Sequence, residues 1–382
     1  MRKKIQPRIL SLFAGCGGLD LGFHNAGYRT VWANDIDEWA VKTFQRNFPD
    51  SIVLQKNIGE IDPETDKTIP DCDLMLGGFP CQDFSVIWKR PGLNGNRGNL
   101  YKHYLRFIDA KRPKAFLAEN VKGLLTANKG QAIKEILERF ENAGDGYMVK
   151  IQLYNFAGYG VPQFRERILI AGIRLDTGFH FVHPSPTHGT GQHKTQYKTS
   201  GDALRGVEQA LDTQKMPKFD KNEIRIADKT RAMLDKIPEG GNFQNIPQND
   251  PHYVKGLISH IYRRLDRSEP AKTIIAAGGG GTWGYHFEES RPLCNRERAR
   301  LQSFPDDFEF EGSVTEIRRQ IGNAVPPDGV MLVAKRLLPL FTGKYERTDL
   351  HKIRGELRKL SVKERLKYDL PDIEKAGKEV IT

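Results

Sequence analysis

Cysteine is scarce in this chain and shows no metal-binding pattern. The 382 residues include four cysteines, and no two of them form a Cys-x-x-Cys pair. Zinc sites and the disulfide frameworks of secreted domains depend on such close spacing. We therefore expect no bound metal, no disulfide framework and a reducing, cytoplasmic environment.

Long apolar runs, internal repeats and low-complexity tracts are also missing. No apolar stretch approaches the roughly 20 residues that a membrane-spanning helix needs, and the basic start Met1-Arg2-Lys3-Lys4 lacks the apolar segment of a signal peptide. We predict no membrane association. The formal net charge is +11 and the pI about 9.3, which favours an anionic partner such as nucleic acid.

Apolar strand-like segments alternate with amphipathic helix-like segments through the first half of the chain. This alternation predicts an α/β fold with a mostly parallel sheet and helices on both faces. The predicted strands are 8–13, 28–33, segments near Leu74 and Ala115, 148–154 and 168–173, and the predicted helices are 19–26, 37–47, 100–110, 131–142 and 324–340.

The composition changes after about residue 174. Gly, Pro, Asn and Gln become frequent and helical periodicity is poor, but scattered aromatic residues argue against a simple linker. We predict a second, smaller, loop-rich domain. The tail 345–382 carries charges of both signs with spaced Leu and Ile, which predicts an exposed helical appendage.

A glycine loop lies between the first predicted strand and helix. It reads Phe13-Ala14-Gly15-Cys16-Gly17-Gly18, without the GxGxxG spacing of dinucleotide sites. Asp35 follows Gly15 by twenty residues, where an acid accepts hydrogen bonds from ribose hydroxyls. The pattern suits S-adenosylmethionine, which has no pyrophosphate; an ordinary strand–helix turn is the alternative. We expect Cys16 to be a packing residue.

Cys81 and Glu119 each follow an apolar run that predicts a buried strand. The runs are 74–78 and 115–118, and Pro80 directly precedes Cys81. Ligands of open α/β sheets bind where strands end, so the thiol and the carboxyl are expected at one edge. A nucleophile beside an acid suits covalent attack on an electron-poor ring that is protonated as it is attacked. A buried structural cysteine is the alternative.

Four motifs with the Phe13 loop occur in an order that resembles the DNA (cytosine-5) methyltransferases, of the bacterial restriction-modification type. They are Phe79-Pro80-Cys81-Gln82, Glu119-Asn120-Val121, Gln163-Phe164-Arg165-Glu166-Arg167 and Gly322-Asn323-Ala324-Val325-Pro326. The resemblance covers about residues 8–175 and 290–340. It implies a Rossmann-like fold that uses S-adenosyl-L-methionine, releases S-adenosyl-L-homocysteine and methylates C5 of a cytosine flipped out of double-stranded DNA.

The resemblance assigns roles to four catalytic residues. The Cys81 thiolate adds to C6, and Glu119 hydrogen-bonds N3 and N4 and shares a proton with N3. Arg167 holds O2 of the cytosine, and Arg165 orients the site and a phosphate. The residues implied to bind the cofactor are Phe13, Ala14, Gly15, Gly17, Leu19, Asp35, Ile36, Asn57, Ile58, Pro80, Leu100, Asn323 and Ala324.

The segment 85–99 is rich in glycine and basic residues, which is typical of a mobile loop that closes over DNA. Predicted phosphate contacts in it are Ser85, Lys89, Arg90 and Arg97. The predicted domains are catalytic and cofactor-binding (1–183 and 309–344), target recognition (184–290), an inter-domain hinge (291–308) and the tail (345–382). Candidate base-reading residues are Asn242, Gln244, Asn245, Arg263 and Arg264.

Three positions depart from the family pattern. Ile36 stands where an aromatic residue is common, Asn57-Ile58 replaces an acid-Ile pair, and Cys294-Asn295 replaces Thr-Pro before Arg296-Glu297. We expect the Asn57 amide oxygen to accept a hydrogen bond from the adenine amino group without a charge.

Several alternatives stay open from the sequence. They are cytosine-5 methylation of RNA such as tRNA, a non-catalytic DNA-binding regulator on the same scaffold, and a nicotinamide oxidoreductase. We expect a monomer, with a cognate restriction endonuclease present as a separate protein rather than in a stable complex.

Overall fold

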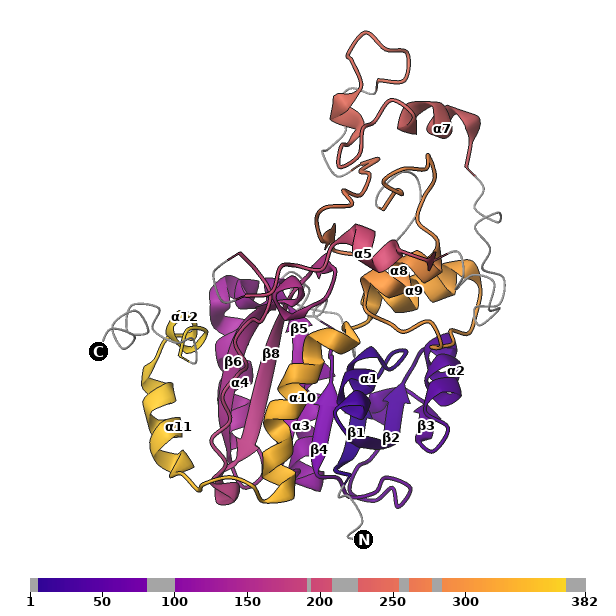
Figure 1. Ribbon diagram of the computed structural model, residues 1–382. Coiled ribbons are helices and arrows are strands. Elements are labelled where there is room, and N and C mark those ends of the chain that lie inside the picture. Colours follow the sequence, from indigo (N-terminus) through magenta and orange to yellow (C-terminus); the bar gives the residue numbers. More distant parts are fainter. Residues whose placement is uncertain are drawn as a thin grey trace, which may run out of the picture.

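The computed structural model describes residues 6–80, 100–190, 194–207, 226–253, 261–276 and 284–368. A large sheet with flanking helices forms one part of the molecule, and a smaller, irregular part that contains α7 (Asp228–Leu234) extends from one end of it (Figure 1). Among the described helices, none combines the length and the apolar composition needed to cross a membrane.

The main sheet confirms the predicted fold class. Its seven strands lie in the order β3-β2-β1-β4-β5-β8-β6, and every neighbouring pair from β3 to β5 is parallel. Only β8 runs against its two neighbours. The strands are β1 (Arg8–Leu12), β2 (Arg29–Asp35), β3 (Ile52–Gln55), β4 (Leu74–Gly77), β5 (Ala115–Val121), β6 (Tyr147–Asn155) and β8 (Glu166–Arg174).

Helices cover both faces because successive side chains of a strand point in opposite directions. Leu74 and Leu76 of β4 pack into the core under one set of helices, and Met75 packs into the core on the other face. The first set is α1 (Gly18–Asn25) and α10 (Pro327–Thr342); the second is α3 (Leu100–Lys111) and α4 (Gln131–Asn142). Both faces are buried, which explains why the strands read as continuous apolar runs.

A third apolar cluster joins the sheet to the smaller part. It contains residues of α8 (Asn295–Leu301) and α9 (Val314–Asn323), together with Phe44 of α2 (Glu38–Asn47) and Phe48 directly after that helix. In Figure 1, α8 and α9 lie between the sheet and the irregular part. A short strand, β7 (Gln163–Phe164), pairs with β9 (Ala271–Lys272) across the same junction. Helix α8 therefore packs between the two parts (Figure 1), and the hinge limits 291–308 stay a prediction.

In its described residues, the smaller part contains few regular elements and one compact apolar cluster. Met233, Leu234, Ile237 and Phe243 form its centre. The regular elements are α5 (Ser200–Leu204), α7 and the 3₁₀ turn Phe243–Asn245. This loop-rich character agrees with the composition, while the exact domain limits stay a prediction.

The prediction of an exposed C-terminal appendage is wrong for the described residues up to 368. Helix α11 (Leu350–Lys359) buries Leu350, Ile353 and Leu357 in the core on one face of the sheet. Helix α12 (Val362–Arg365) follows it, and both pack against β6. Spaced leucines in a charged sequence occur both in exposed surface helices and in helices packed against a sheet. Only the contact with β6 in the folded structure distinguishes the two cases.

Glu141 at the end of α4 holds this tail in place. Its carboxylate is 3% exposed and lies 2.8 Å from Arg358 Nε and 2.7 Å from Arg365 Nη1. Glu141→Ala leaves both guanidinium groups without their anion, so we expect the free energy of unfolding to fall by about 2–3 kcal/mol. Urea unfolding measures this. The matched change Glu138→Ala on the exposed face of α4 should cost under about 0.5 kcal/mol, and equal losses would contradict the assignment.

Candidate active site at the sheet edge

The carboxyl ends of the parallel strands and the first residues of β8 meet at one edge of the sheet. Because β8 is antiparallel to β5, its residue Arg167 pairs with Val121 at the end of β5. An arginine from the beginning of one strand therefore lies beside Glu119 from the end of another. The predicted acid and the predicted guanidinium come together, although 48 positions separate them in the sequence.

Glu119 and Arg167 form an ion pair with an Nε–Oε1 distance of 2.9 Å. Both side chains are largely buried, with 13% and 15% of their surfaces exposed. Burial raises the pKa of Glu119, while the charges of Arg167 and Arg165 oppose that rise. The carboxyl group therefore holds its proton to a higher pH than an exposed glutamate, a change in the direction that general acid catalysis needs.

Asn120 fixes the chain that leads to Cys81, a role that the sequence did not reveal. Its buried Nδ2 donates to the Phe79 carbonyl at 2.8 Å, and its Oδ1 accepts from Val121 N at 2.8 Å. Phe79 and the exposed Pro80 are thereby held next to the end of β5. The catalytic candidate Cys81 and the predicted phosphate contacts Ser85, Lys89, Arg90 and Arg97 lie outside the described residues.

The other three cysteines are unsuited to nucleophilic attack. Burial raises the pKa of Cys16, Cys72 and Cys294 to about 12 in each case. Thiols of this kind carry almost no thiolate at neutral pH. Cys16 packs in the junction core, as predicted. None of the cysteines among the described residues is therefore a rival to Cys81 as the candidate nucleophile.

The predicted contact between Arg165 and a phosphate is wrong for this structure. The side chain is 1% exposed, and its two Nη atoms donate to the carbonyls of Ile274 and Gly322 at 2.9 Å each. Burial lowers its pKa to about 9, so it remains charged at neutral pH. Arg165 ties the β9 segment to the end of α9 and adds positive potential near Glu119.

The glycine loop leaves room for a ligand at the ends of β1 and β2. Gly15 has φ +55°, and a Cβ built on it would meet no atom within 4 Å. Gly15 N donates to Asp35 Oδ2 at 2.8 Å, and Asp37 N donates to Oδ1 at 2.9 Å. Ile36 beside them is 67% exposed, so an apolar surface lies open next to the acid. An open backbone cradle, a carboxylate and an apolar contact fit the ribose and base of a nucleoside.

Two residues predicted to bind the cofactor turn their side chains into the core instead. Leu19 is 7% exposed and Ile58 3%, so only their backbone groups remain for a ligand. Asn323 is exposed at the end of α9, and the chain after it lies against the glycine loop, where a Cβ on Gly18 would be 3.2 Å from Ala324 Cβ. The other predicted residues, Phe13, Ala14, Gly17, Pro80 and Leu100, lie at or near the same edge.

Most of the candidate base-reading residues have structural tasks. Arg264 is buried and donates to the carbonyls of Leu234, Ile237 and His286. Asn242 and Asn245 cap the turn Phe243–Asn245 reciprocally. The prediction of a direct base contact is therefore wrong for Arg264, because its buried guanidinium group is already used to close loops. Asn242 and Asn245 use their Oδ1 atoms in the cap, and their base contacts stay predictions.

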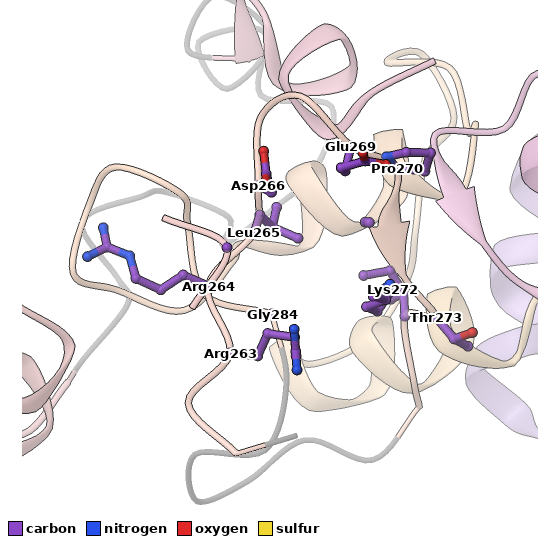
Figure 2. Close-up of a pocket in the computed structure, with 12 residues that line it drawn as sticks. Arg263, Arg264, Leu265, Asp266, Glu269, Pro270, Lys272, Thr273 and Gly284 are labelled. Carbon is purple, nitrogen blue, oxygen red and sulfur yellow. The ribbon is translucent and has the colours of Figure 1, made fainter. Parts of the chain in front are cut away.

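Thr273 lines two neighbouring hollows. The first is lined by Lys122, Asn155, Phe164, Arg167 and Thr273, and so opens beside the Glu119–Arg167 pair. The second lies in the smaller part and is drawn in Figure 2, where Lys272 and Thr273 stand across from Leu265 and Asp266. Thr273 Oγ1 donates to the Phe164 carbonyl at 2.8 Å, which holds the two walls together. The sequence did not single out Lys122, Lys272 or Thr273 as residues that line these hollows.

A metal site is not apparent in the part of the chain that the structure describes. No group of three or more His, Cys, Asp or Glu side chains is placed there to hold an ion.

Comparison with known proteins connects this geometry to a family. The model of the C-5 cytosine-specific DNA methylase family matches residues 7–338. The chain is 60% identical over 363 residues to the Type II methyltransferase M.NgoFVII of Neisseria gonorrhoeae, covering 94% of each. It is 42% identical to the Type II methyltransferase M.BbvI of Brevibacillus brevis, covering 86% of this chain and 90% of that one.

Solved structures share the fold at low sequence identity. A DNA modification methyltransferase described as putative and prophage-encoded, from E. coli, aligns with a TM-score of 0.66 and 23% identity over 88% of this chain and 100% of that one. The Dnmt2 methyltransferase of S. pombe aligns with a TM-score of 0.60 and 18% identity over 88% and 99%. At these identities the alignments establish the common architecture.

Proposed function

The chain belongs to the C-5 cytosine-specific DNA methylase family and is a DNA cytosine-5 methyltransferase, and from this premise we propose that it modifies one word of duplex DNA within a restriction-modification system. The similarity to Type II methyltransferases supports the biological setting. The observation that carries the chemistry is the buried Glu119–Arg167 pair, next to the chain segment that leads to Cys81.

Cys81 is the proposed nucleophile. Its thiolate forms a bond to C6 of the cytosine, and the electron pair of the C5–C6 double bond moves into the ring. This addition makes C5 nucleophilic. After methylation, removal of the C5 proton restores the C5–C6 double bond and expels Cys81 as a thiolate. Water is the proposed acceptor of that proton.

Glu119 and Arg167 stabilise the ring while Cys81 is attached. Glu119 donates a proton to N3 as negative charge reaches it, and takes the proton back when Cys81 leaves. The buried environment that raises its pKa keeps that proton available. Arg167 restrains the Glu119 carboxyl and holds O2 of the cytosine, while Arg165 positions this edge from behind.

The cofactor site is proposed at the ends of β1 and β2. The family uses S-adenosylmethionine, which supplies the methyl group as an electrophilic sulfonium and leaves as S-adenosylhomocysteine. Asp35 would accept hydrogen bonds from the ribose hydroxyls, Ile36 would contact the base, and Gly15 would let the ligand approach the backbone. Addition of the Cys81 thiolate and protonation of N3 by the Glu119 carboxyl group together activate the ring, so the proposed reaction needs no metal.

The DNA is proposed to lie along the two hollows that share Thr273. Lys122 and Arg167 line one hollow beside the acidic Glu166, and Arg263 and Lys272 line the other beside Asp266 and Glu269. Cationic groups that suit phosphate contacts are therefore present in both hollows between the smaller part and Glu119. The target base must be flipped out to reach this acid. Residues 184–290 would read the word, 1–183 with 309–344 would carry out the chemistry, and 291–308 would join them. We propose that the enzyme acts as a monomer, separately from any cognate endonuclease.

Sequencing of bisulfite-treated DNA from a host that expresses the full chain tests this proposal. We expect protected cytosines at one position of a single recognition sequence, in nearly every occurrence of that sequence, and none in cells that express Cys81→Ala. RNA from the same cells is the control for the alternative substrate. Protection in tRNA with unprotected DNA, or protection spread over many unrelated words, would contradict the proposal.

A further inference from the structure

Asn57 at the end of β3 has its amide orientation set by the backbone. Its Oδ1 accepts a hydrogen bond from Gly59 N at 3.0 Å and so caps the turn Ile58–Glu60. A backbone N–H needs an acceptor, so the oxygen and not the NH₂ group must face Gly59. The Nδ2 group is therefore directed to the other side, and no hydrogen-bond partner is found for it among the described residues.

The free NH₂ group lies at the corner where the base of the cofactor is proposed to bind. Lys56 N donates to the Asp35 carbonyl at 3.2 Å, and Asn34 Nδ2 donates to the Lys56 carbonyl at 2.8 Å. These bonds hold the chain immediately before Asn57 against the end of β2, beside Asp35. Asn57 is exposed, and the neighbouring apolar side chain Ile36 is 67% exposed.

The amide inverts the polarity that a carboxylate would give at this position. One oxygen of an aspartate would cap Gly59 N, and the second would accept a hydrogen bond from the amino group at C6 of adenine. With Asn57 the cap uses the only oxygen, and the outer atom is a donor. A donor does not pair with an amino group, but it pairs with the carbonyl oxygen of a 6-oxopurine.

We propose that Asn57 presents hydrogen-bond donors to the base of the bound cofactor, so that the site discriminates weakly between adenine and a 6-oxopurine. The inference rests on the proposed cofactor site. It corrects the expectation that the amide oxygen of Asn57 serves the adenine amino group, because that oxygen is already bonded to Gly59 N.

Calorimetric binding of two product analogues to the full chain tests the inference. The ligands are S-adenosylhomocysteine and S-inosylhomocysteine, which differ in the amino or oxo group at C6. For the wild type we expect dissociation constants within about threefold of each other, since no strong acceptor reads the amino group. In Asn57→Asp, which retains the cap, we expect the preference for adenine to rise at least about tenfold through a charge-assisted hydrogen bond.

Two control variants test whether the change in ligand preference comes from the polar group of residue 57 that faces away from Gly59 N. Asn57→Ser keeps an oxygen for the cap but lacks the outer NH₂ donor, so its ratio should shift toward adenine by only a few-fold, well below the shift in Asn57→Asp. Gln55→Glu adds a charge two residues earlier and should leave the ratio unchanged. A tenfold change in either control would overturn the assignment.

The outcomes distinguish this inference from the proposed function. A wild-type preference for adenine above about 30-fold, or an unchanged ratio in Asn57→Asp while both ligands bind, overturns the inference alone. Failure of both ligands to bind the wild type overturns the cofactor site on which it rests.

Discussion

Cys81→Ala is expected to abolish methyl transfer, with a fall in turnover of at least about 10⁴-fold. Without the thiolate, C5 of cytosine does not become nucleophilic enough to accept a methyl group. The variant should still bind duplex DNA and S-adenosylhomocysteine, because the proposed contacts to both lie in other residues. Incorporation of radiolabelled methyl groups into duplex DNA measures the loss, and band-shift and calorimetric assays measure the binding.

Covalent trapping provides a second readout for Cys81. Duplex DNA with 5-fluorocytosine at the target position cannot release the enzyme, since fluorine replaces the proton that must leave C5. We expect a denaturation-resistant adduct with the wild type and none with Cys81→Ala. Cys72→Ala is the matched control, because burial raises the pKa of that thiol to about 12, and it should form the adduct normally. An adduct or appreciable turnover in Cys81→Ala would remove Cys81 from the mechanism.

Glu119→Gln should lower turnover by about 10²–10⁴-fold with little change in DNA affinity. Glutamine retains the shape and a hydrogen-bond donor but cannot transfer a proton to N3. Single-turnover kinetics on duplex DNA give the chemical rate. The surface change Glu138→Gln is the matched control and should leave the rate unchanged, and an active Glu119→Gln enzyme would contradict proton transfer by this residue.

The pH dependence provides an independent test of the Glu119 assignment. Burial raises the pKa of this carboxyl group. The protonated form is the active one, so the rate should be high below that pKa and decline as the pH rises through it. Arg167 opposes the rise in pKa, so Arg167→Gln should move the alkaline decline to higher pH while reducing the rate. The decline should disappear in Glu119→Gln; its persistence there would assign it to another group.

Local sequence patterns determined the layered fold. Apolar runs that alternate with amphipathic segments predicted the parallel strands and their helices, because each pattern depends on residues a few positions apart. The same reasoning predicted Asp35, Cys81 and Glu119 at strand ends. In the structure Asp35 and Glu119 belong to the last residues of β2 and β5, and Cys81 lies outside the described residues. The prediction of an exposed C-terminal tail was wrong, because the spacing of Leu350, Ile353 and Leu357 does not reveal whether another surface packs against them. The packing of that face in the core could only come from the tertiary structure.

The active-site residues show the same division. By itself, the sequence determined the kinds of groups present: a thiol after a proline, an acid near the end of a strand, two alternating arginines and a glycine loop. The tertiary structure decided which arginine meets the acid, because the antiparallel direction of β8 places Arg167 beside Glu119 while Arg165 is used by the carbonyls of Ile274 and Gly322. It also decided that the Asn57 amide oxygen accepts the hydrogen bond from Gly59 N. The physical reason is that residue type limits the hydrogen bonds a side chain can make, and only the folded backbone chooses which partners occupy them.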